Sequence, residues 1–124
     1  MKILIAEDEP IMLMALETSL KKEGYTILTT TDGREALNYL EEFNPDLLIT
    51  DIMMPFTTGL ELLGIVKSNS TKNIPVIVVS GMGQESIVLE AFKMGADDFL
   101  TKPFNPDELL TRVKRLLQSH KKNS

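Results

Sequence analysis

Four short apolar runs in this sequence each end on residues that can bind phosphate or a metal ion. Glu7 and Asp8 follow the first run, Asp51 the second, Ser80 the third and Lys102 the fourth. If these runs are parallel strands, their carboxyl ends meet at one edge of a sheet, where open α/β sheets bind their ligands. Crowded carboxylates repel one another by roughly 1 to 4 kcal/mol per close pair unless a cation lies among them. The pattern therefore predicts a pocket that holds a metal ion.

Each of these residues also has a structural explanation when it is taken alone. Asp8 or Glu9 could cap the helix that follows, and Asp51 could begin a turn. Ser80 could hydrogen-bond to its own loop, and Lys102 could be an ordinary surface lysine. Their shared position, at the same end of different strands, favours one functional site over separate structural roles.

Strand-like and helix-like segments alternate along the chain, and this order predicts the fold class. Strands are expected at about 2–6, 25–29, 46–50, 75–79 and 97–100, and helices at about 10–22, 33–42, 58–68, 84–93 and 106–118. Such alternation is typical of an α/β fold with a parallel sheet and helices on both faces. Because five strands are too few to close a barrel of this type, we predict an open, doubly wound sheet.

Several helix boundaries carry local signals. Capping boxes are predicted at three helix starts, namely Asp32/Glu35, Thr58/Glu61 and Asn105/Glu108. Pro10 suits the first position of a helix, where its missing N–H is not needed. These signals support the helix starts that the alternation predicts.

The composition predicts a single domain. The chain has 124 residues, of which 43% are hydrophobic, and this is enough for one core and too little for two domains. We assign residues 1–118 to the domain and residues 119–124 to a polar tail or the stump of a linker. The sequence has no cysteine, which excludes disulfides and thiolate metal sites, and its one histidine, His120, lies in the tail. Any metal ligands must therefore be oxygen atoms.

Charge and hydropathy limit the location and the partners. No apolar run approaches the length that spans a bilayer, and the first residues lack the apolar stretch of a signal peptide. We therefore expect a cytoplasmic protein without membrane contact. The net charge of −5 argues against direct binding to nucleic acid, which requires a basic surface. The expected partners are proteins.

Four sequence blocks, read together, resemble the response regulator receiver domain of two-component signal transduction, including chemotaxis-type receiver domains. They are ILIAEDEP, ITDIMMPFTTG, VIVVSG and DDFLTKPF, in the family's order and over about residues 2–118. The resemblance implies a flavodoxin-like sheet of five parallel strands in the order 2-1-3-4-5, with five helices.

The resemblance also implies a phosphorelay function. Asp51 would accept a phosphoryl group from the phosphohistidine of a histidine kinase and become an aspartyl phosphate. Magnesium would be held by Asp8, Asp51 and the backbone carbonyl of Met53, with Glu7 acting through water, which fits the oxygen ligands that Mg²⁺ prefers. The domain would be no conventional enzyme, since it would catalyse only its own phosphorylation and its own slow dephosphorylation.

The remaining residues of the resemblance describe a switch. Lys102 would pair with the acceptor carboxylate and then with the phosphoryl oxygens. Ser80 would donate its hydroxyl to a phosphoryl oxygen and draw its loop inward, and Phe99 would turn inward in response. The peptide bond between Lys102 and Pro103 would be cis.

Two surfaces are predicted to bind partners. The helix at 10–22 has more apolar residues than one core stripe requires, so we assign Ile11 and Met14 to an exposed patch that docks a sensor kinase or a phosphotransfer protein. By resemblance, the helix at 84–93, the strand at 97–100 and the helix at 106–118 form the output surface for an output domain or a homodimer. Met53 and Met82, which flank the pocket, are expected to slow hydrolysis of the phosphoryl group.

Three other functions are compatible with parts of the pattern. A binder of FMN would need hydroxyls and amides after the first strand, where AEDEP supplies carboxylates. An aspartate-dependent phosphatase would need a second acid two residues after its nucleophile, where Met53 follows Asp51. A receiver-like module that acts in protein interactions without phosphorylation remains the alternative.

Overall fold

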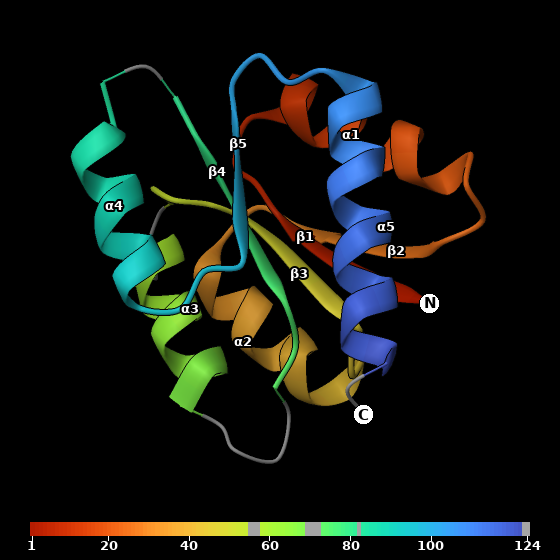
Figure 1. Ribbon diagram of the computed structural model, residues 1–124, viewed down its shortest axis with the longest axis horizontal. Helices are drawn as coiled ribbons and strands as arrows, with labels where there is room; N and C mark the ends of the chain where they lie inside the picture. Colours follow the sequence, from red (N-terminus) through yellow and green to blue (C-terminus); the bar gives the residue numbers. More distant parts are fainter. Residues whose placement is uncertain (55–57, 69–72, 82, 123–124) are drawn as a thin grey trace.

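The computed structural model describes residues 1–54, 58–68, 73–81 and 83–122 (Figure 1). The elements in chain order are β1 (Lys2–Ala6), α1 (Pro10–Lys21), β2 (Thr26–Thr30), α2 (Gly33–Glu42), β3 (Leu47–Asp51), α3 (Gly59–Ser68), β4 (Val76–Ser80), α4 (Glu85–Lys93), β5 (Asp98–Thr101) and α5 (Pro106–Lys122). The predicted boundaries lie within one residue of these, with one exception. Helix α5 was expected to end at 118 and continues to Lys122, because the polar tail still permits helical backbone.

The five strands form one parallel sheet in the order β2-β1-β3-β4-β5, which confirms the predicted fold class. Strands β3 and β4 are buried at all five positions, as a central strand covered on both faces must be. In the register of the sheet, Ala6 lies beside Thr50 and Ser80 lies beside Thr101. The residues that follow β1, β3 and β5 therefore emerge at the same edge.

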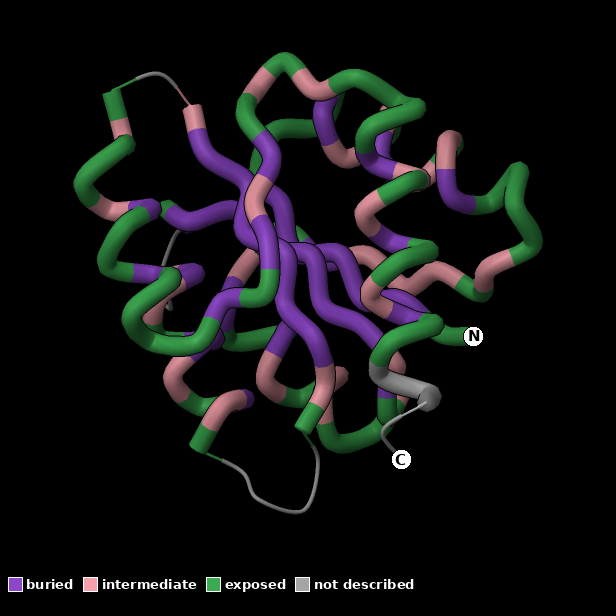
Figure 2. Tube along the Cα trace, in the orientation of Figure 1, coloured by how far each residue is buried: buried purple, intermediate pink, exposed green. Residues whose placement is uncertain are grey.

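Two hydrophobic cores pack against the two faces of the sheet. Helices α1 and α5 cover one face, through Leu16 and Leu20 of α1 and Leu109 and Val113 of α5. Helices α2, α3 and α4 cover the other face. Figure 2 shows the central strands as the most continuously buried part of the chain. Because both faces are covered, the sheet can offer a binding site only at its edges.

Helix α1 separates its apolar residues in the way that the sequence predicts. Met12, Leu16 and Leu20 are buried in the core. Ile11 is 86% exposed and Met14 is 66% exposed. The second apolar surface of α1 therefore faces solvent.

The helix starts confirm one capping box in full, at the start of α3, and half of the other two. At α2 the amide of Asp32 donates to the Thr30 hydroxyl at 3.3 Å and not to Glu35. The side chain of Asp32 accepts a hydrogen bond from the amide of Glu35 at 2.8 Å. At the start of α3, the amide of Glu61 donates to the Thr58 hydroxyl at 3.2 Å, while the Glu61 carboxylate accepts from Thr58. The third box, at α5, is half formed as well. Its Asn105 side chain accepts from the amides of Asp107 and Glu108, but the carboxylate of Glu108 contacts Arg112 instead.

Candidate functional site

The loop after β1 contributes two acids to the carboxyl edge of the sheet. Glu7 is fully buried, and its carboxylate accepts a hydrogen bond from the amide of Glu9 at 3.0 Å. The amide of Glu7 continues the pairing of β1 with β2 by donating to the carbonyl of Thr30. Asp8, the next residue, is exposed. The strand thus delivers one acid into the protein and one to its surface.

Asp51 ends β3, and the surrounding backbone fixes its position. Its side chain accepts a hydrogen bond from the amide of Met53 at 3.3 Å, and it is 5% exposed. Gly59, the first residue of α3, packs directly on the backbone of Asp51, so that a β-carbon there would overlap the Asp51 carbonyl. The amide of Gly59 also donates to the carbonyl of Ile52 at 3.1 Å. Close contact with α3 therefore fixes the chain that follows β3.

Lys102 connects the acids to β5. Its ammonium group lies 3.2 Å from Asp51, 3.1 Å from Glu7 and 3.2 Å from Glu9. The amide of Lys102 donates to the carbonyl of Ser80 at 2.8 Å, and the peptide bond to Pro103 is cis. One lysine therefore joins carboxylates from two strand ends.

The acidic group has the composition of a metal site. One carboxylate oxygen each of Glu7, Asp8 and Asp51 lies within 4.8 Å of the others. The Oε1 atom of Glu7 is buried and lies 3.1 Å from the Lys102 ammonium, yet it has no hydrogen-bond partner among the described residues. A set of oxygen ligands with excess negative charge is what a hard divalent cation such as Mg²⁺ prefers. The residues present therefore fit the predicted ion.

The crowding alters the acidity of these groups. Burial raises the pKa of Glu7 to about 7, and the nearby Asp51 carboxylate acts in the same direction. Burial also raises the pKa of Asp51, the contact with Asp8 adds to this, and Lys102 opposes it. For Lys102, burial acts to lower the pKa, but the surrounding carboxylates outweigh it and the pKa is raised. A single ammonium group therefore does not satisfy the buried acids.

The predicted switch residues and the methionines expected beside the pocket differ in how far they are buried. Ser80 is buried at the end of β4. The ring of Phe99 is half-buried, with Phe92 of α4 against it at 5.7 Å between ring centres. Met53 is exposed at the rim of the site, while Met82 lies outside the described residues.

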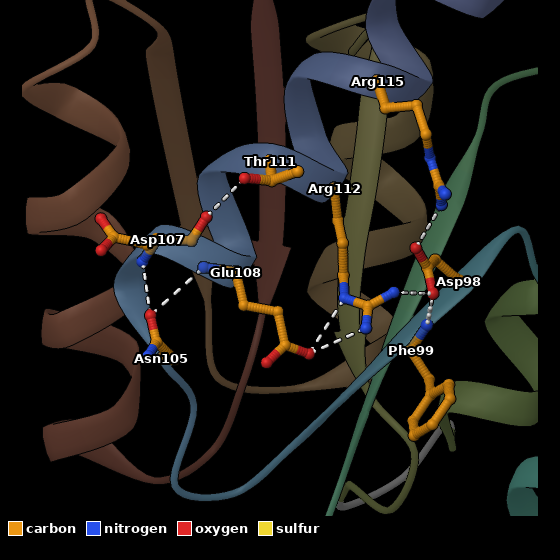
Figure 3. Close-up of polar contacts among 8 residues, drawn as sticks. All are labelled: Asp98, Phe99, Asn105, Asp107, Glu108, Thr111, Arg112 and Arg115. Atoms are coloured by element: carbon orange, nitrogen blue, oxygen red, sulfur yellow. Dashed lines mark hydrogen bonds and ion pairs between the residues drawn. The ribbon is translucent and has the colours of Figure 1, made fainter.

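A second group of charged residues surrounds Asp98 at the start of β5, and the sequence reasoning did not find it. Arg112 and Arg115 of α5 each donate to one oxygen of Asp98 at 2.6 Å (Figure 3). Arg112 also contacts the carboxylate of Glu108 at 2.9 Å and lies over the ring of Phe99. The only sequence signal was the spacing of Glu108, Arg112 and Arg115 along one helix, which does not reveal a partner on β5.

Two other residues of the site were also missed. Glu9 was considered only as a helix cap, but its side chain makes no capping hydrogen bond and contacts Lys102. Gly59 was not singled out, because its close contact with Asp51 depends on the packing of α3.

Within the part of the chain that the structure describes, no helix is both long and apolar enough to cross a bilayer.

Comparison with known proteins places these features in one family. A family model described as the response regulator receiver domain matches residues 3–114. Response regulator GtcR of Aneurinibacillus migulanus is 40% identical over 116 residues, which are 94% of this chain and 47% of that protein. Regulatory protein VanR of Enterococcus faecium is 39% identical over 123 residues, or 99% of this chain and 52% of that protein. The chain thus spans about half the length of these relatives.

Solved structures show the same fold. A response regulator receiver domain protein from Clostridium thermocellum has a TM-score of 0.92 at 28% identity, and the match covers 99% of this chain and 98% of that chain. The receiver domain of Francisella response regulator 1452 has a TM-score of 0.87 at 35% identity, covering 96% of this chain and 98% of that chain. The likeness therefore extends over nearly the whole of each chain.

Proposed function

The chain belongs to the response regulator receiver domain family, and from this premise we propose that Asp51 is phosphorylated by a histidine kinase in a Mg²⁺-dependent reaction. Receiver domains of response regulators are regulatory modules rather than conventional enzymes. The observation that carries the proposal is the convergence of Glu7, Asp8, Asp51 and Lys102 at one edge of the sheet. Each of the four comes from the end of a strand or the loop after it.

In the proposed transfer, a carboxylate oxygen of Asp51 attacks the phosphorus atom of a phosphohistidine. The phosphorus–nitrogen bond breaks as the oxygen–phosphorus bond forms, and the imidazole nitrogen keeps the electron pair. Phosphoryl transfer depends mainly on in-line positioning and on neutralising charge. The amide of Met53, which donates to the Asp51 side chain, and the close packing of Gly59 on the Asp51 backbone hold the acceptor in place for such positioning.

Charge neutralisation is divided between lysine and metal. Lys102 already lies 3.2 Å from Asp51, and its ammonium can donate to a phosphoryl oxygen as the group arrives. Asp8, Asp51 and the Met53 carbonyl would hold Mg²⁺, with Glu7 reached through water. When bound, the ion supplies positive charge that offsets the repulsion between the anionic acceptor and the anionic phosphoryl group.

We further propose that phosphorylation alters the surface through Ser80 and Phe99. The Ser80 hydroxyl would donate to a phosphoryl oxygen, and Phe99 would move with the loop after β4. Phe99 lies between Phe92 of α4 and Arg112 of α5, so its movement would change contacts on both helices. The surface made by α4, β5 and α5 is accordingly the proposed output surface for an output domain or a second copy.

The proposed donor is a sensor kinase or a phosphotransfer protein that docks on α1. Ile11 and Met14 are large apolar residues on the exposed side of α1, and this helix begins directly after the acidic loop. A partner bound there could place its phosphohistidine beside Asp51. Met53, exposed at the rim, is proposed to slow the approach of water to the phosphorylated residue.

Incubation with acetyl phosphate, with and without Mg²⁺, tests the central proposal. Intact mass should show one added phosphoryl group in the presence of Mg²⁺, and peptide mapping should place it on Asp51. The Asp51→Asn variant should take up none, while Asp107→Asn, which alters an exposed acid on α5, should be labelled like the parent. Equal labelling of Asp51→Asn and the parent would show that the acceptor is elsewhere.

A further inference from the structure

We propose that Glu9 is a positioning residue for Lys102, which it holds in the resting protein and releases when a phosphoryl group arrives at Asp51. This inference rests on the proposed function. Glu9 does not belong to the group of Glu7, Asp8 and Asp51 that fits the metal ion. The inference gives Glu9 a role in the change from the resting to the phosphorylated site.

The contacts of Lys102 leave no donor free. An ammonium group has three N–H donors. In the structure these face the three carboxylates of Glu7, Asp51 and Glu9, at hydrogen-bond distances of 3.2 Å each. A phosphoryl oxygen is a fourth acceptor, so one of the three contacts must be given up for Lys102 to bind it.

Burial decides which contact is released most easily. The side chain of Glu7 is 1% exposed and that of Asp51 is 6% exposed, whereas that of Glu9 is 62% exposed. Losing its partner would leave the buried Glu7 carboxylate uncompensated, which is strongly unfavourable. The exposed Glu9 carboxylate can exchange the same contact for water at little cost. Of the two contacts that Lys102 makes outside the acceptor Asp51, the contact with Glu9 is therefore the one that gives way.

Local structure explains why Glu9 is available for this role. It occupies the N-cap position of α1, but glutamate is not among the preferred caps and its side chain makes no capping bond. Its amide donates to the Glu7 carboxylate at 3.0 Å, which ties its backbone to the acidic loop. Backbone and side chain of Glu9 thus contact both members of the Glu7–Lys102 pair.

A contact that exists only in the resting state opposes the phosphorylated state. Ion pairs with an exposed partner are weak, and their measured strength corresponds to a change of about two- to fivefold in an equilibrium constant. Removal of the Glu9 contact should therefore favour any ligand that occupies the phosphoryl position by that factor.

The test measures binding of beryllium trifluoride, a noncovalent mimic of the phosphoryl group, to the full chain. Mg²⁺ is kept at a concentration that saturates each variant, because the loss of an acid also weakens metal binding. Glu9→Gln should bind the probe about two- to fivefold more tightly than the parent. Glu17→Gln is the matched control, since Glu17 lies on the same helix and pairs with Lys21 at 3.0 Å. It should bind like the parent.

Two further variants separate the contact from the charge. Glu9→Asp keeps the charge but shortens the side chain, so it should resemble Glu9→Gln if contact with Lys102 matters. In a Lys102→Ala background, the substitution Glu9→Gln should change probe binding by less than about 1.5-fold. Thermal unfolding verifies that each variant is folded.

The outcomes distinguish this inference from the proposed function. The inference is overturned if Glu9→Gln binds the probe no more tightly than the parent, or if its effect persists without Lys102. Should the parent neither bind the probe nor take label from acetyl phosphate, the proposed function itself fails. Label on Asp51 with no effect at Glu9 removes only the present inference.

Discussion

Buried charge is compensated in opposite ways at the two ends of β5. At the start of the strand, the single carboxylate of Asp98 is bound by the guanidinium groups of Arg112 and Arg115. Just after the end of the strand, the single ammonium of Lys102 faces the carboxylates of Glu7, Glu9 and Asp51. In the first cluster two guanidinium groups balance the carboxylates of Asp98 and Glu108, whereas the second cluster has too little positive charge for its acids.

The difference separates a structural cluster from the proposed phosphoacceptor site. Each oxygen of Asp98 receives a short, charge-assisted hydrogen bond, and the contact with Asp98 is the chief cause that raises the pKa of Arg112. In the other cluster, burial raises the pKa of Glu7 to about 7, and one of its oxygens has no hydrogen bond among the described residues. A bound cation can supply the missing positive charge, which the proposed phosphoryl transfer requires.

The largest expected effect is on the rate of phosphoryl uptake, and it should differ between the cationic residues Lys102 and Arg112 of the two clusters. Lys102→Ala should lower the rate of phosphoryl uptake from acetyl phosphate by about a hundredfold or more, since a donor aimed at developing negative charge is worth that much. Arg112→Ala should change the rate by less than about threefold, because Arg112 contacts Asp98, Glu108 and Phe99 rather than the acceptor. Uptake is followed by intact mass at saturating Mg²⁺. Equal losses in the two variants would abolish the distinction.

A second effect comes from the raised pKa of Glu7. The folded value of about 7 lies above the ordinary value of 4.5, so the folded state binds this proton more tightly than the unfolded state does. The ionised Glu7 carboxylate lowers the free energy of unfolding. This loss is fully present above pH 7 and diminishes as the pH falls toward 4.5. In metal-free buffer, the free energy of unfolding should therefore gain roughly 2 to 3 kcal/mol between pH 8 and pH 5 from this group.

The matched variant for this prediction is Glu7→Gln, which cannot ionise. Urea unfolding at several pH values should show a weaker pH dependence than in the parent, leaving the part that Asp51 contributes with the same sign. Saturating Mg²⁺ should reduce the slope in the parent, because the ion stabilises the ionised carboxylates. If the free energy of unfolding depended on pH in the same way in parent and variant, ionisation of Glu7 would not destabilise the folded state.

The sequence predicts the fold well because its signals are local and repeated. Continuous apolar runs at β3 and β4 identify central parallel strands, and the alternation with helices fixes the order of elements. The carboxyl-end rule then brings Glu7, Asp51 and Lys102 together without any knowledge of side-chain positions. The end of α5 was misplaced because polar residues at 119–122 suit a helix and a tail equally.

The contacts that the sequence did not predict depend on three-dimensional packing. The overlap that a β-carbon at Gly59 would have with Asp51 arises only when α3 packs on the end of β3. The pairing of Asp98 with Arg112 requires a particular placement of α5 beside β5. An exposed glutamate at the start of a helix, as at Glu9, looks like a solvated acid until Lys102 is positioned beside it.

The smallest expected effect concerns the cluster around Asp98. Removing the charge of Asp98 should lower the free energy of unfolding, whereas protonation of Glu7 should raise it. Asp98→Asn should lower the free energy of unfolding by about 1 to 2 kcal/mol, because it weakens two charge-assisted hydrogen bonds. The loss is moderated because the side chains of Arg112 and Arg115 are 28% and 62% exposed and can regain water. Urea unfolding at pH 8 in metal-free buffer, with Glu90→Gln on α4 as an exposed control, measures it. If Asp98→Asn instead raised the free energy of unfolding, the pairing of Asp98 with Arg112 and Arg115 would not stabilise the contact between β5 and α5.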